Sequence, residues 1–426
     1  MAEFSATVYQ NEFLPDGGTD VNAIVTITCS GAGSAGKTGA GDAGEIIIVD
    51  TSGSMGRSKL EAAKAAASAA IDQILDGTWF AVVAGTHQAY LAYPPVRTGT
   101  GMVRMGPRAR FEAHQAISLF RSDGGTAMGA WLTLAGRLFD SVPMLAQRHA
   151  ILLTDGENHN ETPDQLTTAI RGVTGRFQCD CRGVGVDWQV AEVRRIAQAM
   201  LGTVDIIPSV EEMGHVFAEL MQQSMSRGVP DAQLRVWSPQ GAEVTFVRQV
   251  SPSVEDLSSR RVAVNPLTGS YPTGSWGDES RDYHVSIRLS PKAIGQEQLA
   301  ARVQLTIADE VVAQGLVKAK WSDDEHLTTR INPEVAHYTG QEELAQAIQD
   351  GLAAKAAGDV DTATVKLGRA VQLAAETGNN EATAKLRKVV DIDNVETGTV
   401  RLKRAVDKAD EMALDTASTK TTRIRS

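Results

Sequence analysis

Residues 46–54 read Ile-Ile-Ile-Val-Asp-Thr-Ser-Gly-Ser, and this stretch determines the fold. Four β-branched apolar residues in a row predict a strand that is buried on both faces, as in a parallel sheet. The strand ends in Asp-x-Ser-x-Ser, which places three oxygen-bearing side chains at alternate positions. In open α/β sheets, ligands bind at the carboxyl ends of the strands. Carboxylate and hydroxyl oxygens suit Mg²⁺ and not zinc, so the stretch predicts a magnesium-type site at that edge.

Two later segments supply further oxygen ligands in matching positions. Thr126 lies in the loop Asp-Gly-Gly-Thr that precedes an apolar helical segment, and Asp155 follows the apolar strand 150–154. Together with Asp50, Ser52 and Ser54, they resemble the metal ion-dependent adhesion site of von Willebrand factor A domains. The competing interpretation is that Asp50 and Ser52 only cap the next helix. A cap does not explain the two distant matches.

The resemblance implies a function as well as a fold. It implies that Asp50, Ser52, Ser54, Thr126 and Asp155 bind Mg²⁺, or Mn²⁺ or Ca²⁺, directly or through water. It also implies that an Asp or Glu of a partner protein completes the coordination. The chain is therefore expected to be a metal-dependent protein-interaction module and not an enzyme. No nucleophile motif or positioned general base supports a hydrolase.

Composition and charge restrict the partners and the compartment. The net charge of −11 and the pI near 5.3 argue against nucleic acid. The sequence has no run of about 20 apolar residues that would span a membrane, and we expect no signal peptide in its first residues. Three cysteines are too few for a disulfide framework. The sequence therefore resembles an intracellular, bacterial-type member of the family, and we expect a cytoplasmic protein.

The pattern of strands and helices predicts three kinds of domain. Residues 45–229 alternate strand-like and helix-like segments, which predicts a doubly wound, mostly parallel, Rossmann-like sheet. Residues 230–325 contain short strand-like runs separated by Pro and Gly, which predict a β-sandwich. Residues 1–44 hold two more strand-like runs and a Gly-rich linker. Two strands alone are marginal in water, so we expect them to complete the sandwich, with the α/β domain inserted in it.

The C-terminal part predicts helices and a free tail. Residues 335–415 are helical in pattern, and Thr364–Ala370 recurs as Thr399–Ala405. The offset of 35 resembles a tetratricopeptide repeat, although a plain helical bundle fits equally well. Residues 416–426 are expected to be disordered. Within them, Thr421 has Ile424 three positions on, which predicts a phosphothreonine site for a forkhead-associated domain.

A second motif suggests nucleotide binding. Gly31–Thr38 matches the pattern Gly-x-x-x-x-Gly-Lys-Thr, and Asp50 ends the next apolar strand. A phosphate-binding loop must open a helix, whereas residues 39–44 are a poor helix. A P-loop nucleotide hydrolase is therefore the alternative function, and a flexible linker is the favoured interpretation of this loop.

Overall fold

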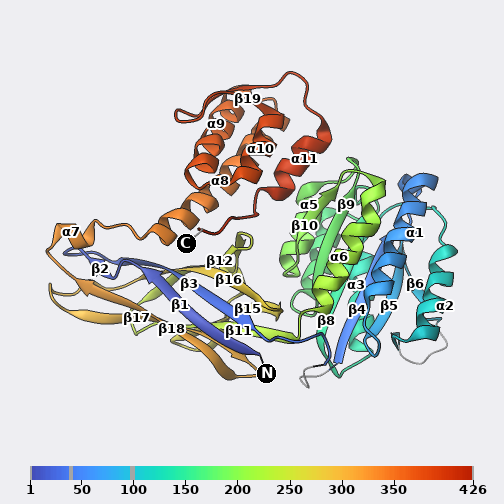
Figure 1. Ribbon diagram of the computed structural model, residues 1–426, viewed down its shortest axis with the longest axis horizontal. Helices are drawn as coiled ribbons and strands as arrows, with labels where there is room; N and C mark the ends of the chain where they lie inside the picture. The colour runs from blue at the N-terminus through green and yellow to red at the C-terminus, as the bar shows by residue number, and fades with distance from the viewer. Residues whose placement is uncertain (1, 38–41, 96–100, 425–426) are drawn as a thin grey trace. The chain divides into compact units, whose positions relative to one another are not determined.

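The computed structural model describes residues 2–37, 42–95 and 101–424, which divide into two compact units (Figure 1). We call the first the α/β unit; it is built mainly of residues 31–231. We call the second the sandwich unit; it is built mainly of residues 3–30, 232–273 and 279–426. Among the described residues, no helix combines the length and apolar character that crossing a bilayer requires.

The α/β unit is organised around the stretch that the sequence singles out. Strand β4 (Asp42–Asp50) lies inside a mixed sheet and pairs in parallel with β5 (Trp79–Gly85) and β8 (Leu145–Thr154). Ile46–Val49 are fully buried, as expected for a strand covered on both faces. Beyond β8 the sheet continues with β9 (Gln178–Val184) and β10 (Val204–Ile207), and beyond β5 with the antiparallel strands β6 (Ala89–Tyr93) and β7 (Val103–Arg104).

Helices cover both faces of this sheet. One face buries Ile47 and Val49 under α1 (Gly56–Gln73), α2 (Pro107–Ser118) and α6 (Met213–Met225). The inward stripe of α1 consists largely of alanines, which let α6 pack closely beside it. Helix α3 (Met128–Asp140) packs on the sheet with α4 (Pro163–Val173) beside it, and α5 (Val190–Ala199) packs on β9.

The N-terminal strands belong to the sandwich unit. Strand β3 (Asp20–Ser30) pairs with β1 (Glu3–Gln10) on one side and β16 (Glu279–Arg288) on the other. Strand β2 (Phe13–Leu14) joins β18 (Glu310–Trp321) in the second sheet. The remaining strands are β12 (Glu243–Ser251) and β13 (Glu255–Asp256) in the first sheet, and β11 (Val229–Trp237), β14 (Val262–Asn265), β15 (Thr268–Trp276) and β17 (Glu297–Ile307) in the second.

Packing explains why the chain returns to this unit. A Cβ placed on Gly315 of β18 would lie 2.6 Å from Val8 and 3.6 Å from Val25, so the two sheets meet closely there. Strands β3 and β2 therefore pair with strands that come more than 200 positions later. The 201 residues of the α/β unit from Gly31 to Asp231 lie between β3 and the body of β11.

The predicted tetratricopeptide-like repeat is wrong. Thr364–Ala370 lies in α9 (Val360–Glu376), but the second copy forms β20 (Thr399–Leu402) and the loop after it. Strand β20 pairs with β19 (Val390–Asn394), and their alternating apolar side chains pack into the helical core. The other helices are α7 (Glu325–Thr328), α8 (Pro333–Ala356), α10 (Asn380–Val389) and α11 (Lys408–Ala417).

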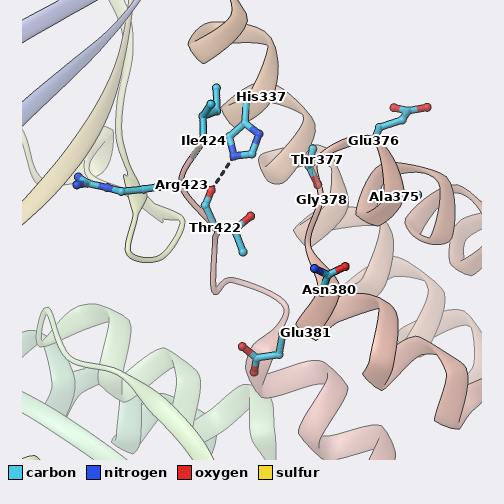
Figure 2. Close-up of a pocket in the computed structure, with 10 residues that line it drawn as sticks. All are labelled: His337, Ala375, Glu376, Thr377, Gly378, Asn380, Glu381, Thr422, Arg423 and Ile424. Carbon is cyan, nitrogen blue, oxygen red and sulfur yellow. Dashed lines mark hydrogen bonds between the residues drawn. The ribbon is translucent and has the colours of Figure 1, made fainter. Parts of the chain in front are cut away.

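The predicted disordered tail is also wrong for the part of it that the structure describes. Helix α11 extends to Ala417, and residues 418–424 run along the end of β12. The Arg423 guanidinium lies 2.9 Å from Asp282, and the Thr422 carbonyl accepts a 2.6 Å hydrogen bond from His337 (Figure 2). Composition alone could not reveal these acceptors and donors, because they come from distant strands and helices. Residues 425–426 lie outside the described part.

Candidate functional site

The five predicted ligand residues converge at the carboxyl edge of the α/β sheet. Because β4 and β8 run in parallel with Val49 opposite Leu153, they end at the same level. Asp50 ends β4, and Asp155 directly follows β8. Thr126 precedes the first turn of α3, which packs against β5 and β4. The topology therefore places the three segments around one point, as the carboxyl-edge rule requires.

Short contacts link four of these side chains. The Ser52 and Ser54 hydroxyls are 2.9 Å apart, and Ser54 Oγ donates to Asp155 Oδ1 at 2.7 Å. Asp50 Oδ1 accepts from the Ser52 backbone N–H at 2.8 Å, and Asp50 Oδ2 accepts from Thr154 Oγ1 at 2.7 Å. Each hydroxyl or carboxylate is thus oriented by a neighbour within the cluster.

Thr126 faces the same point across Gly156. A Cβ built on Gly156 would lie 3.0 Å from Ser54 Oγ and 3.5 Å from Thr126 Oγ1, so both hydroxyls face this backbone position. Any larger residue at position 156 would crowd the two hydroxyls. We therefore place all five predicted residues in one cluster, which contains two carboxylates and three hydroxyls.

A lysine that the sequence analysis missed also belongs to this cluster. Lys59 Nζ lies 2.7 Å from Asp155 Oδ2 and 3.5 Å from Asp187 Oδ2. Partial burial lowers the pKa of Lys59, but the hydrogen bond and attraction from Asp155 outweigh it and raise the pKa overall. A signal was present in the sequence: Lys59 lies in the first turn of α1, where the helix dipole disfavours a cation unless a carboxylate compensates it.

Burial also affects the first carboxylate. Asp50 is fully buried, and this burial raises the pKa of Asp50 to about 6 despite the hydrogen bonds from Ser52 and Thr154. Repulsion from Asp155 acts in the same direction as burial. Without a cation, the cluster therefore holds its two carboxylates at an electrostatic cost, which a bound cation would relieve.

A second set of polar residues fixes the loops that carry the predicted ligand residues. Ser122 Oγ donates to the Ser52 carbonyl at 2.7 Å, and the Gly53 N–H donates to the Gly124 carbonyl at 2.8 Å. Asn160 Oδ1 accepts from the Thr126 N–H at 3.0 Å, and Glu161 accepts from the first amides of α3. These residues hold Thr126 toward the cluster and give no sequence pattern by which they could be recognised.

The donor set fits a hard divalent cation. Hydroxyl and carboxylate oxygens are typical ligands of Mg²⁺, Mn²⁺ and Ca²⁺. In the described residues, no group of three or more His, Cys, Asp or Glu side chains is placed to hold a metal ion. Cys179 and Cys181 are buried side by side, with their sulfurs 3.9 Å apart. The described part of the chain therefore offers no cluster of His and Cys ligands that would form a zinc site.

Within the described residues, the alternative phosphate-binding loop is not followed by a helix. Residues 31–37 form a loop that leads, within the described residues, into strand β4 from Asp42. The N-terminal amides of a helix hold the phosphates in such motifs, and the described part offers none there. Thr38 lies outside the described residues.

The predicted phosphosite is engaged inside the sandwich unit. Thr421 Oγ1 donates to the Val250 carbonyl at 2.6 Å, and the Thr421 N–H donates to the Pro252 carbonyl at 3.1 Å. A kinase would need the tail to detach before reaching this hydroxyl. Modification of Thr421 and its recognition by a forkhead-associated domain stay predictions.

The fold and the cluster define a Rossmann-like α/β domain with polar loops at the carboxyl edge of its sheet. Comparison with known proteins gives the family. The profile described as von Willebrand factor type A domain matches residues 46–157, and the one described as von Willebrand factor type A C-terminal domain matches residues 372–418. The solved structure of a von Willebrand factor type A protein from Catenulispora acidiphila is 48% identical, with a TM-score of 0.93, over 99% of this chain and 97% of that one. The chain belongs to the von Willebrand factor type A family.

Two other similar proteins match over a shorter part of their length or at lower sequence identity. An uncharacterized protein of Synechocystis is 29% identical over 218 residues, and the match spans 49% of that protein, about half of its length. The ArnB paralog VWA2 from Sulfolobus acidocaldarius shares the fold with a TM-score of 0.58 over 98% of both chains. At 14% identity, that likeness concerns the fold alone.

Proposed function

We propose that this protein is a metal-dependent protein-binding module that acts by binding and not by catalysis. Asp50, Ser52, Ser54, Thr126 and Asp155 would hold Mg²⁺, or Mn²⁺ or Ca²⁺, and an Asp or Glu of a partner protein would complete the coordination. One observation supports the proposal most strongly. Ser54 Oγ lies within hydrogen-bond distance of Asp155 Oδ1 and Ser52 Oγ, and it faces the same backbone position, Gly156, as Thr126 Oγ1.

The charge of the cluster favours capture of a carboxylate. Asp50 and Asp155 contribute two negative charges when ionised, and Lys59 returns one positive charge. Counting Asp50, Asp155 and Lys59 alone, a bound divalent cation would leave a charge of about plus one, and Asp187, 3.5 Å from Lys59 Nζ, offsets part of this charge. An incoming carboxylate would neutralise this charge, whereas a neutral or basic group would not. The site therefore selects for acidic side chains.

Metal-linked stability tests the site. Binding to the folded state alone adds roughly 2.7 kcal/mol of stability at a ligand concentration of 100 Kd. Mg²⁺ or Mn²⁺ should raise the melting temperature of the wild type, and Ser54→Ala and Thr126→Ala should reduce the gain. Ser118→Ala, an exposed serine of α2, is the matched control and should keep it. An equal gain in all four proteins would show that the ion binds elsewhere.

Partner binding tests the function. Capture of proteins from the source cells should be compared with Mg²⁺ and with EDTA, using wild type and Thr126→Ala. Partners of the metal site should be lost with EDTA and with Thr126→Ala together. A partner set that is unchanged by both treatments would contradict the proposal.

A further inference from the structure

A groove lies directly beside the cluster of five predicted ligand residues in the α/β unit. Its volume is about 490 Å³, and its apolar lining comes from Tyr90 and Ala92 of β6 and from Ala116, Leu119 and Phe120 at the end of α2. Tyr90 is 50% exposed and Leu119 is 76% exposed. Large apolar side chains gathered at an open groove are typical of a surface that a partner covers.

The groove and the cluster share one wall. Thr51 and Asp123 line the groove, and the Asp123 N–H donates to the Thr51 carbonyl at 2.9 Å. Thr51 stands between the proposed ligand residues Asp50 and Ser52. Successive side chains of an extended segment point to opposite sides. The groove therefore opens on one side of Thr51 and the metal cluster on the other.

Charged groups surround both the groove and the proposed metal-binding cluster. A bound cation would bring positive charge to the cluster, and the exposed residue Arg121 adds one positive charge at the groove rim. The exposed carboxylate of Asp123, which accepts a hydrogen bond from the Gly124 N–H, offsets one positive charge. The surface as a whole thus joins a carboxylate-binding point to an apolar cradle.

We infer that this groove is the specificity pocket of the metal site and takes a large apolar side chain, such as Leu, Ile or Phe, from the same peptide segment whose Asp or Glu binds the metal. This inference rests on the proposed function. An extended peptide advances about 3.3 Å per residue, so one short segment can carry both the carboxylate and the apolar side chain across the wall. The partner is therefore a protein with an exposed acidic and apolar segment.

The test uses defined peptides. Fluorescein-labelled octapeptides of Gly and Ser should each carry one Asp and one Leu, in both orders and at every spacing, with Leu replaced by Ser in the matched set. Fluorescence polarisation with Mg²⁺ should show at least one spacing at which the Leu peptide binds about tenfold tighter than its Ser counterpart, a difference of about 1.4 kcal/mol.

Protein variants then locate the preference. Leu119→Ser and Tyr90→Ser should remove the advantage of the Leu peptides while the Asp-dependent binding stays sensitive to EDTA. Met144→Ser is the matched control, since Met144 is 59% exposed but lies in the loop before β8, at the opposite edge of the sheet. It should leave the preference intact.

The failures of the two proposals differ. Mg²⁺-dependent binding of Asp peptides without a Leu preference, or with a preference that survives Leu119→Ser, would overturn the groove and leave the metal site standing. A Leu preference that ignores EDTA and Thr126→Ala would overturn the link between the two. Absence of binding by every peptide would count against both.

Discussion

Replacing His149 should destabilise the α/β unit in a way that depends on pH. His149 lies in β8, fully inside the sheet, between two carboxylates. Its Nδ1 lies 2.7 Å from Glu45 Oε2 of β4, and its Nε2 lies 3.0 Å from Asp180 Oδ2 of β9. Both ring nitrogens must donate to satisfy both carboxylates, so the ring is held as an imidazolium.

The surrounding charges determine the size of the effect. Burial alone lowers the pKa of His149, but attraction by Glu45 and the hydrogen bonds with Asp180 and Glu45 outweigh it and raise the pKa to about 9. Burial alone raises the pKa of Asp180, but His149, with Arg227 and Arg182 nearby, brings it below its usual range. From about 6.5 to about 9, the shift of His149 corresponds to roughly 3 kcal/mol of stability.

The sign of the pH dependence follows from the raised pKa. The folded protein holds the proton more tightly than the unfolded chain does. The stabilisation is therefore fully present below about pH 6.5 and is lost as the pH rises through about 9. His149→Gln removes the charge and leaves two buried carboxylates facing each other, which should cost about 3–5 kcal/mol at neutral pH.

Urea unfolding followed by tryptophan fluorescence measures the effect. Stability should be compared at about pH 6, 7.5 and 10 for wild type, His149→Gln and the control His215→Gln, whose side chain is 73% exposed. The advantage of wild type over His149→Gln should shrink by about 3 kcal/mol across this range. An advantage that stays constant, or grows with pH, would refute the buried imidazolium. His215→Gln should match wild type throughout.

Three further predictions test other parts of the structure. Lys59→Met should lower the melting temperature of the metal-free protein, because the buried carboxylate of Asp155 loses its cation, and should increase the Mg²⁺-induced rise; a smaller rise would contradict this. Gly85→Ala should cost about 1–3 kcal/mol in denaturant titrations, because the new Cβ would lie 2.4 Å from the ring of Trp131. Thr421→Asp should detach the tail and speed tryptic cleavage after residue 420, and a cleavage rate equal to wild type would show that the tail does not depend on this hydroxyl.

Local patterns in the sequence determined the α/β unit and its candidate site. The four apolar residues before Asp50 predict a strand buried on both faces, and the alternation expected over residues 45–229 appears as helices such as α1, α3 and α4 between strands of the sheet. These features repeat with the period of a strand or a helix, so neighbouring residues suffice to reveal them. The convergence of the predicted ligand residues follows because parallel strands bring their carboxyl ends together.

Only the tertiary structure decided features that depend on distant partners. The segment Thr399–Leu402 resembles part of α9 in sequence but forms a strand, because it pairs with β19 and packs on the helical core. The tail is polar enough to be free in water, yet Thr421 meets an acceptor on β12. The role of Lys59 likewise depends on Asp155, and the groove beside Leu119 is formed by residues that are far apart in the chain. Such contacts leave no local period, because chain folding and not sequence spacing brings the partners together.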